Sequence, residues 1–303
     1  MKKVKKIWIL IAIICVIVGC VVAGAAAAHA GFDFTKFNTA TQEEKTYSVT
    51  ESFENIDIQT TECNIVLLPS EKNVCEIVCT ESDKITHTVS VENNTLKVVR
   101  EDTRKWYERI GVFFSVSNFE IEVYLPRGEY ETLEASSASG DIVVSDAFTF
   151  SEVDLSTASG NISYASNTKN AWNGKTSSGD IEITNIIGGT VNVKSTSGEI
   201  TLEECQADAI ELVSTSGDIS LEDTIAEARL SIKTTSGDVS LESCDSADIA
   251  IQTTSGDVRG TLRSEKQFIT STTSGDISHP DSTSGSQKCT VNTTSGDIRL
   301  TVE

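Results

Sequence analysis

A Ser-Gly-Asp tripeptide, or a variant with Glu or Asn in third place, recurs nine times in the C-terminal half of this 303-residue chain. Successive glycines are 19 to 21 residues apart. They are Gly140, Gly160, Gly179, Gly198, Gly217, Gly237, Gly256, Gly275 and Gly296. A repeat this short and regular predicts a stacked array, in which each unit buries its apolar face against its neighbours.

The alternation around each glycine predicts two short strands per repeat. The second residue after every glycine is aliphatic and β-branched, from Ile142 to Ile298, and the residue that follows it is mostly polar. Upstream, apolar residues recur seven and five positions before the glycine, as Val191 and Val193 do. A period of two with one apolar side is typical of a half-buried strand. The inward side changes across Ser-Gly-Asp, so the chain must bend at the glycine, which tolerates such corners.

These features predict an all-β fold, a single-stranded parallel β-solenoid (β-helix) with one coil per repeat, preceded by an N-terminal transmembrane helix. We expect cytoplasmic lysines and the anchor over 1–30, a stalk over 31–45, an irregular β cap with the first coils over 46–133, and regular repeats over 134–303. The final repeat ends at Glu303 without a cap. We therefore expect an open strand edge there, protected by Arg299 and Glu303 or by pairing with a second copy.

The N-terminal segment predicts export. Four lysines precede an uncharged apolar run over residues 7–28, which is long enough to span a bilayer as a helix. The lysines favour a cytoplasmic N-terminus, with the bulk of the chain outside the cell membrane. Two alternatives stay open, because Ala28-His29-Ala30 has the small residues of a cleavage site and Ile17-Val18-Gly19-Cys20 resembles a lipoprotein box with Cys20 acylated. All three alternatives place the repeats outside.

Composition and motifs disfavour several functions. The net charge is −21 and the first 30 residues contain no acidic residue, so the exported part is strongly acidic. Such a charge disfavours nucleic acid and anionic lipid surfaces. No nucleophile elbow, phosphate-binding loop or metal-binding motif occurs, and the three histidines are far apart, with His279 in an inward-facing column. The sequence predicts a protein that is not an enzyme; the alternative is a polysaccharide hydrolase or lyase that uses clustered acids.

Stacking also places one acidic or amide side chain per coil in a column next to the glycines. Like charges about 5 Å apart repel by roughly 1 kcal/mol even in a water-like dielectric. We expect these groups to accept hydrogen bonds from turn N–H groups, aided by the preceding Ser and Thr. The alternative is a calcium ladder, since hard cations prefer oxygen ligands. Its candidate ligands are Asp180, Asp218, Asp238, Asp257, Asp276 and Asp297.

One stretch of the predicted cap combines basic and aromatic side chains in an otherwise acidic region. It contains Arg104, Lys105, Trp106, Tyr107 and Arg109. A contact with a partner or with a membrane surface is one interpretation, and a loop whose aromatic rings complete the core of the cap is the other.

Eight cysteines in an exported chain raise the question of disulfides. Cys205 and Cys244 occupy the same coil position two rungs apart, which exceeds the Cα separation of about 7 Å that a disulfide tolerates. Only Cys63 with Cys75 or Cys79 remains open. A disulfide-based scaffold is not expected.

The Thr-Thr-Ser-Gly-Asp-Ile repeats resemble those of the β-strand-repeat family labelled "putative adhesins", as do Gly31-Phe32-Asp33-Phe34 and Tyr124-Leu125-Pro126. The resemblance implies an anchored bacterial envelope protein without an established catalytic residue or cofactor. We expect an extracytoplasmic binding, adhesion or scaffold module that contacts a glycan or an envelope protein. The alternative that it implies is a regulatory or sensory subunit of an envelope-stress system acting through membrane partners.

Overall fold

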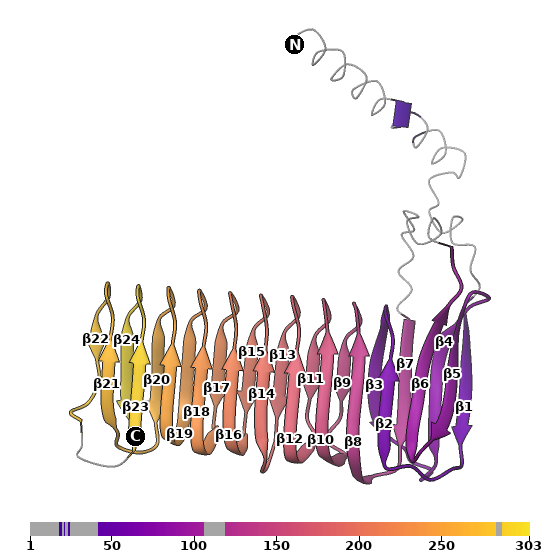
Figure 1. The fold of residues 1–303 in the computed structure, drawn as a ribbon, viewed down its shortest axis with the longest axis horizontal. Helices are drawn as coiled ribbons and strands as arrows, with labels where there is room; N and C mark the ends of the chain where they lie inside the picture. Colours follow the sequence, from indigo (N-terminus) through magenta and orange to yellow (C-terminus); the bar gives the residue numbers. More distant parts are fainter. Residues whose placement is uncertain (1–17, 20, 22–23, 25–41, 106–118, 283–286) are drawn as a thin grey trace.

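The computed structural model describes residues 18–19, 21, 24, 42–105, 119–282 and 287–303. From residue 42 onward the chain winds into a straight rod of stacked coils (Figure 1). Each regular coil contributes one strand to each of two facing sheets, called here sheet A and sheet B. Strand β19 (Val239–Gln252) belongs to both sheets, because it continues around a corner without a break.

The other strands divide between the two sheets. Sheet A contains β1 (Glu43–Val49), β3 (Cys63–Pro69), β4 (Cys75–Glu81), β7 (Phe119–Leu125), β9 (Ile142–Val144), β11 (Ile162–Tyr164), β13 (Ile181–Thr184), β15 (Ile200–Glu203), β17 (Ile219–Glu222), β20 (Val258–Leu262), β22 (Ile277–Ser278) and β24 (Ile298–Val302). Sheet B contains β2 (Asn55–Gln59), β5 (Ile85–Glu92), β6 (Thr95–Asp102), β8 (Gly128–Ser137), β10 (Phe148–Thr157), β12 (Asn167–Lys175), β14 (Thr190–Lys194), β16 (Gln206–Val213), β18 (Ile225–Lys233), β21 (Gln267–Ser271) and β23 (Lys288–Asn292).

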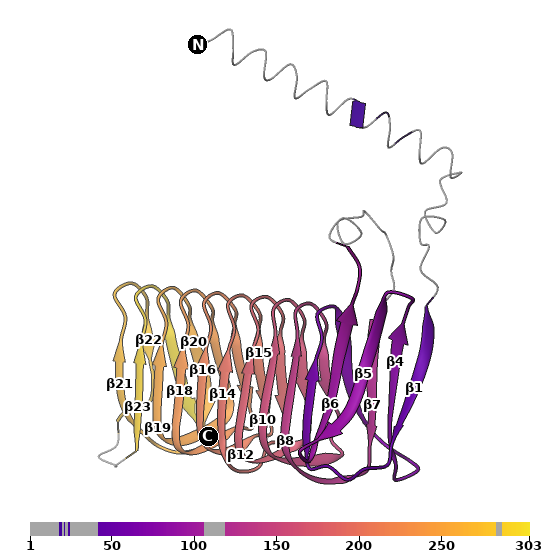
Figure 2. The same cartoon turned by 45° about the vertical axis from the view of Figure 1, so that its right-hand side comes forward.

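Strands of neighbouring coils are parallel and in register along the middle of the rod (Figure 2). In sheet A, Ile200 pairs with Ile219, and Ile219 pairs with Val239. In sheet B, Val191 pairs with Ile210. Equivalent residues of successive repeats therefore stack in columns, which confirms the solenoid predicted from the period.

The two sheets enclose an apolar core made of the predicted inward columns. Eight of the nine aliphatic residues that follow the repeat glycines by two positions are at most 1% exposed, and Ile277 is the exception. Trp172 is fully buried beside Gly174, where a Cβ would stand 2.2 Å from the indole ring. Each such side chain contributes roughly 1.5–3 kcal/mol by leaving water. The repeat thus forms one continuous core.

The N-terminal end corrects the expectation of a purely parallel solenoid. There β1 pairs antiparallel with β4, β4 with β7, and β5 with β6. Strands β5 and β6 form a hairpin whose two turn residues, Asn93 and Asn94, have φ angles of 51° and 63°, as a type I′ turn requires. These antiparallel strands close the N-terminal end of the stack of parallel coils. A further parallel coil therefore finds no matching strand edge to pair with at this end.

The C-terminal end corrects a second expectation, because the last coil in sequence is not the last coil in space. Strand β24 lies between β20 and β22, and β23 lies between β19 and β21. The outermost coil is therefore β21–β22, where Ile277 is 43% exposed. Arg299 and Glu303 do not protect an outer edge: Arg299 pairs with Asp297, and the Glu303 carboxylate accepts a hydrogen bond from Ser243. The outer strand β22 has only two residues, and Pro280 follows soon after it. A short edge strand limits unwanted pairing.

The same interleaving occurs at the N-terminal end. Strand β2 lies between β6 and β8, and β3 lies between β7 and β9. The first coil of the chain is thus inserted between two later coils. The coils β2–β3 and β23–β24 are therefore held by hydrogen bonds on two sides, whereas β1 pairs only with β4.

A buried lysine fastens the inserted C-terminal coil. Lys266 is 0% exposed, and its ammonium donates to the Asp245 carboxylate, to Ser246 O (2.8 Å), to Ser264 Oγ (2.8 Å) and to Gln287 Oε1 (2.6 Å). Asp245 and Ser246 lie in β19, Ser264 lies shortly before β21 of the outer coil, and Gln287 lies just before β23 of the inserted coil. The contacts therefore tie the outer coil to β19 across the inserted one.

The predicted transmembrane segment, residues 7–28, lies almost entirely outside the described residues. Within the described part of the chain, no helix is both long and apolar enough to cross a membrane. The division of the chain at residues 30 and 45 stays a prediction.

Candidate binding surface

The Ser-Gly-Asp corners form one edge of the rod, called here the ladder edge. It consists of residues 138–141, 158–161, 177–180, 196–199, 215–218, 235–238, 254–257, 273–276 and 294–297. In Figure 1 it is the upper edge, along which the narrow loops follow one another. The two residues before each glycine are exposed in every repeat. The ladder edge therefore presents the same small polar side chains once per rung.

Each glycine of the ladder edge is required by the neighbouring coil. A Cβ at Gly217 would stand 1.8 Å from Gly198 O, and a Cβ at Gly198 would stand 1.7 Å from Gly179 O. The same contact recurs from Gly140 to Gly296, at 1.7–2.2 Å. None of these glycines except Gly275 has a positive φ. Close approach of backbone, and not an unusual dihedral angle, thus explains the repeat.

A column of buried hydroxyl groups supports the glycines. From Gly140 to Gly256, the side chain three residues before each of these seven glycines accepts a hydrogen bond from the glycine N–H, for example Thr157 Oγ1 from Gly160 N at 3.0 Å. The Thr157 hydroxyl also donates to Gly140 O of the preceding coil at 3.2 Å. One hydroxyl therefore closes its own corner and joins it to the preceding coil.

The column of acidic and amide side chains after the glycines is a second inter-coil ladder. Asp180 N–H donates to Asn161 Oδ1 at 2.8 Å, and Asp257 N–H donates to Asp238 Oδ1 at 2.8 Å. The carboxylates do accept amide hydrogen bonds, as expected, but from the coil that stacks on them. The ladder is broken at one described position: Glu199 has one methylene more, and the Asp218 amide forms no equivalent hydrogen bond with it.

Some of the repulsion within this column is offset locally. Arg259 lies 2.5 Å from Asp257 Oδ2, and Arg299 lies 2.7 Å from Asp297 Oδ2. The amide of Asp276, followed by Arg299, holds the pKa of the Asp297 carboxyl below its usual value. No described group of three or more His, Cys, Asp or Glu side chains is arranged to hold a metal ion. The calcium ladder of Asp180, Asp218, Asp238, Asp257, Asp276 and Asp297 stays an untested prediction.

A groove of about 580 Å³ runs beside the ladder edge across several coils. Its lining includes the exposed Ala158, Ser177 and Thr196, with Lys175 and Lys194 from the adjoining strands. The groove is shallow and parallel to the axis of the rod, and its lining exposes more apolar than polar surface. Such a shape fits an extended chain better than a compact small molecule.

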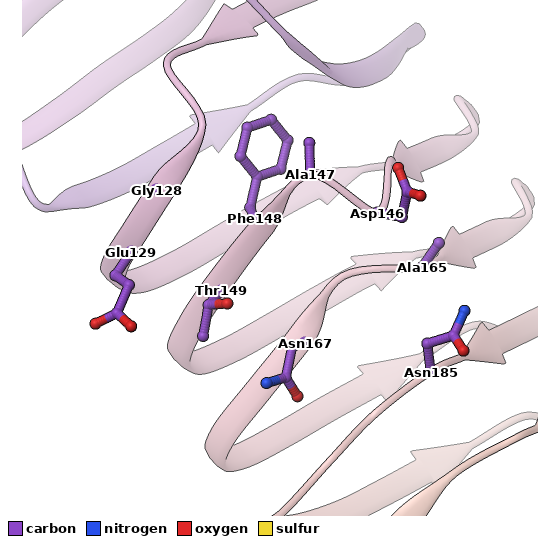
Figure 3. Close-up of a pocket in the computed structure, with 9 residues that line it drawn as sticks. All are labelled: Gly128, Glu129, Asp146, Ala147, Phe148, Thr149, Ala165, Asn167 and Asn185. Atoms are coloured by element: carbon purple, nitrogen blue, oxygen red, sulfur yellow. The ribbon is translucent and has the colours of Figure 1, made fainter.

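A separate depression of about 500 Å³ lies on the opposite edge (Figure 3). The polar side chains at its rim are partly engaged: Lys169 is 2.8 Å from Glu129, and Asn167 Oδ1 accepts a hydrogen bond from Ile187 N at 2.9 Å. Nearby corner residues Asn185 and Glu204 have φ angles of 62° and 52°. This edge is therefore built from left-handed corners and lacks the uniform ladder.

The basic and aromatic stretch of the cap is only partly described. Arg104 Nη2 lies 2.8 Å from both Glu62 Oε2 and Asp102 Oδ2, so its charge is balanced within the protein. Lys105 is also engaged in an interaction. Trp106, Tyr107 and Arg109 lie outside the described residues. The described half of this predicted contact thus offers no unpaired arginine.

The cap contains a buried polar cluster that sequence reasoning missed. Glu81 Oε1 accepts hydrogen bonds from the Tyr47 hydroxyl (2.6 Å) and from His87 N–H (2.7 Å). The His87 ring lies 3.4 Å from Glu81 through Nδ1 and 3.9 Å from Cys63 Sγ through Nε2. A signal was present, because the alternation of β4 and β5 places Glu81 and His87 in inward columns among apolar residues.

Burial sets the charges of this cluster. It lowers the pKa of His87 more than the nearby Glu81 raises it. Burial alone would raise the pKa of Glu81, but Tyr47, the His87 amide and Lys45 outweigh it and the pKa is lowered. The pKa of the Cys63 thiol is raised by burial, so the thiolate is disfavoured. A buried thiol of this kind is poorly suited to act as a nucleophile.

The cysteines of the rod are buried thiols. Cys63, Cys75, Cys79, Cys205, Cys244 and Cys289 are all free. The disulfide that remained open between Cys63 and Cys75 or Cys79 is therefore not formed. Cys205 and Cys244 instead donate weak hydrogen bonds to the carbonyls of Glu203 and Glu242 at 3.3 Å, as Thr224 does to Glu222 between them at 2.9 Å.

His279, predicted in an inward column, lies at the outermost coil and stacks on Phe268 with 4.9 Å between ring centroids. It covers part of the open end of the core. Its side chain has a neighbouring backbone carbonyl, Pro280 O, at 2.7 Å. No acidic partner of the kind a catalytic base uses contacts it within the described residues.

One solved structure supports the fold assignment, and a second is reported beside it. A "Putative lipid binding protein" from Parabacteroides distasonis is 15% identical, covers 85% of this chain and 96% of its own, and has a TM-score of 0.51. A "putative adhesin" from the same organism is 11% identical, covers 88% of this chain and 98% of its own, and has a TM-score of 0.46. At these identities the first similarity concerns the fold alone. No curated protein matches the sequence.

The profile of one family, described as Toastrack DUF4097, matches residues 53–302, from the loop before β2 to the end of β24. That range includes both interleaved ends and every repeat of the ladder edge. The chain therefore belongs to the Toastrack DUF4097 family.

Proposed function

We propose that this chain is a non-enzymatic binding module of a bacterial cell envelope, in which the ladder edge binds an extended polymer. The observation that supports this most directly is the groove of about 580 Å³ that runs along the ladder edge. Its polar groups recur once per coil, so a polymer with its own regular repeat meets equivalent groups at successive coils. Many weak contacts of this kind sum to useful avidity.

The first candidate for the polymer is a cell-wall glycan. A glycan chain is long, rich in hydroxyl groups and able to lie in a shallow groove. The exposed Ser177 and Thr196 and the ammonium groups of Lys175 and Lys194 offer donors and acceptors at the groove. An envelope protein with an extended polar segment is the alternative partner.

Residues 7–28 serve, in this proposal, as a single membrane anchor with the N-terminus in the cytoplasm. The first strand of the rod, β1, belongs to the capped end, and the outermost coil β21–β22 forms the other end. An anchor before β1 therefore presents the rod with its cap nearest the membrane. The ladder edge is then available along the whole length outside the cell.

The test is co-sedimentation of the purified full chain with insoluble peptidoglycan. A triple variant, Ala158→Glu, Ser177→Glu and Thr196→Glu, adds three negative charges to exposed groove positions. We expect the bound fraction to fall by at least tenfold, because the carboxylates occupy the groove.

The matched control carries the same added charge on the outer face of sheet A, as Thr201→Glu, Ser220→Glu and Ser240→Glu. These residues lie between inward-facing neighbours of β15, β17 and β19. The control should bind as the parent chain does. Equal binding by the parent and the groove variant would remove the groove from the proposal, and absence of binding by the parent would reject peptidoglycan.

A further inference from the structure

A cavity of about 380 Å³ at the capped end of the rod differs in kind from the ladder edge. It lies between the end of β1, the loop after β1, the turn before β4 and the start of β8. The rings of Phe53 and Tyr130 form its aromatic part, stacked with 6.1 Å between centroids and 21° between planes. The Tyr130 hydroxyl donates to Pro126 O at 2.8 Å, which fixes the orientation of that ring.

The polar part of the lining is unengaged. Thr50, Glu51, Ser52 and Asn73 border the cavity, and none of these side chains forms a hydrogen bond or ion pair with another described residue. The depression on the opposite edge differs, because Glu129 and Asn167 there have partners. Free donors and acceptors beside a stacked aromatic pair are what a ligand site needs, with an apolar body and a few placed polar groups.

The charge of the lining narrows the ligand class. Among the described residues, Glu51 is the only charged one that borders the cavity, and no described lysine or arginine does. The chain as a whole carries −21. A phosphate, a sulfate or an anionic lipid head group would therefore meet repulsion and no cation.

The polar rim also disfavours a purely apolar ligand. An acyl chain would cover Thr50, Ser52 and Asn73 without offering them a hydrogen bond, at a cost of about 1–3 kcal/mol for each buried group. A ligand with one apolar face and a ring of hydroxyl groups satisfies both parts of the lining. An uncharged pyranose ring has that form.

We infer that this cavity is a subsite for an uncharged sugar residue, with the C–H face of the ring on Phe53, which Tyr130 supports from its other side, and its hydroxyl groups bonded to Thr50, Ser52 and Asn73. This inference rests on the proposed glycan-binding function and names a second, local contact for the same class of polymer. It places recognition of a single sugar, or of a chain end, at the cap. The ladder edge then binds the extended part of the chain.

Asn73 offers a clean way to test the subsite. Its φ of 55° is a conformation that glycine adopts without strain, so Asn73→Gly removes the amide and keeps the turn. Asn93, at the tip of the β5–β6 hairpin, has a φ of 51° and does not border the cavity. Asn93→Gly is therefore a matched control in the same cap.

The experiment is calorimetric titration of the full chain, purified in a detergent without a sugar head group. The probes are chitotetraose and maltotetraose, with tetragalacturonate as the anionic comparison. We expect at least one neutral probe to bind, Asn73→Gly to weaken it about fivefold through one lost hydrogen bond, and Phe53→Ala to weaken it more. Asn93→Gly should bind as the parent does, and tetragalacturonate should not bind.

The subsite is refuted if neither neutral probe binds at millimolar concentration, if Asn73→Gly and Phe53→Ala bind as the parent does, or if tetragalacturonate binds equally well. Peptidoglycan binding that depends on the groove but not on Asn73 would reject the subsite and leave the proposed function intact. If the parent chain binds neither peptidoglycan nor a neutral oligosaccharide, both the subsite and the proposed function are rejected.

Discussion

The repeat glycines are required by the space between coils. At Gly217 the nearest backbone atom of the preceding coil is the carbonyl oxygen of Gly198. A Cβ at Gly217 would stand 1.8 Å from this oxygen, far inside van der Waals contact. Any side chain at these positions must push two coils apart. The coil spacing is fixed by the hydrogen-bonded strands on both sides, so the backbone cannot yield locally.

We predict that Gly217→Ala destabilises the rod by about 3 kcal/mol or more, in the range that marks a severe steric defect. Gly128→Ala is the control, because a Cβ there has no neighbour within 4 Å. Thermal unfolding followed by circular dichroism measures both. A Gly217→Ala variant that melts with the parent would contradict the steric explanation.

The broken position of the side-chain ladder offers a gain of stability. We predict that Glu199→Asp adds about 0.5–1.5 kcal/mol, because the shorter carboxylate can accept the Asp218 N–H as its neighbours do. Hydrogen exchange of the Asp218 amide is the measurement, and its protection should rise. The reverse change, Asp218→Glu, should weaken the existing 2.8 Å bond from Asp238 N–H and lower protection there.

At the scale of elements, the sequence was most informative where one pattern repeats. The inward columns, the corner glycines and the β5–β6 hairpin follow from period and turn residues. The interleaving of β2–β3 and of β23–β24 does not, because these coils carry the same alternation as their neighbours and fit any rung. Pro280 and the spacing of 21 residues between Gly275 and Gly296 mark the last coils as irregular in the sequence, but they do not show the order of these coils in space.

The candidate site was predicted less well for the same reason. The column of acidic side chains was visible in the sequence. Whether these carboxylates accept hydrogen bonds from backbone amides or bind calcium depends on the distances between coils, which the sequence does not give. The cap cavity joins Phe53, Asn73 and Tyr130, which are separated by tens of residues and lie in the non-repeating region. No period relates them, so only the three-dimensional structure brings them together.

The buried cluster of the cap predicts sensitivity to acid. The pKa of His87 is lowered in the folded state, so the unfolded chain takes up a proton below its ordinary value of 6.5 while the folded chain resists. The pKa of Glu81 is lowered from 4.5, so its contribution is also lost as the pH falls. Arg100 on β6, Lys45 and Tyr47 on β1 and Cys63 on β3 face the same cluster.

We predict that the stability of the cap is constant above pH 7 and falls as the pH is lowered from about 6.5 to 4. Hydrogen exchange of β1 and β5 should report it, with the middle of the rod as the internal reference. His87→Gln should remove the part of the slope near pH 6.5. A slope unchanged by this substitution would assign the acid sensitivity to other groups.

The lysine that ties the inserted coil makes a second prediction at this scale. We expect Lys266→Met to cost about 3–5 kcal/mol, because it leaves the Asp245 carboxylate without its buried partner. The loss should be confined to β21–β24, as measured by hydrogen exchange. The exposed Lys288→Met should change stability by less than about 0.5 kcal/mol. Uniform loss along the rod would contradict a local fastening role.

At the scale of the whole molecule, the rod is a stack whose coils interact mainly with their neighbours, so its stability is a sum of similar interfaces. The strongly negative net charge is spread along that stack. The ladder carboxylates each give one oxygen to a backbone amide of the next coil, as Asp180 does to Glu199 N–H at 2.9 Å. This hydrogen bonding already stabilises the column without a cation.

We therefore predict that millimolar calcium raises the thermal midpoint of the full chain no more than the same concentration of magnesium does. Screening of a net charge of −21 by any divalent cation accounts for a small common rise. Differential scanning calorimetry with chelator, magnesium and calcium is the measurement. A calcium-specific rise of many degrees would establish the calcium ladder instead.

The interleaved coils determine how the rod responds to pulling or to proteolysis at its termini. In a simple stack the terminal coil has one neighbour, and a tug on the chain end peels it away rung by rung. Here the coil that ends at Val302 has a hydrogen-bonded neighbour on each side, whereas β1, the first strand of the rod, pairs only with β4. A force applied to the C-terminal end must slide a strand out from between two others, so that many bonds resist at once, whereas a force at the N-terminal end meets the single β1–β4 pairing first. At the C-terminal end, the outer coil β21–β22, which has a neighbour on one side only, would therefore yield before the end of the polypeptide does.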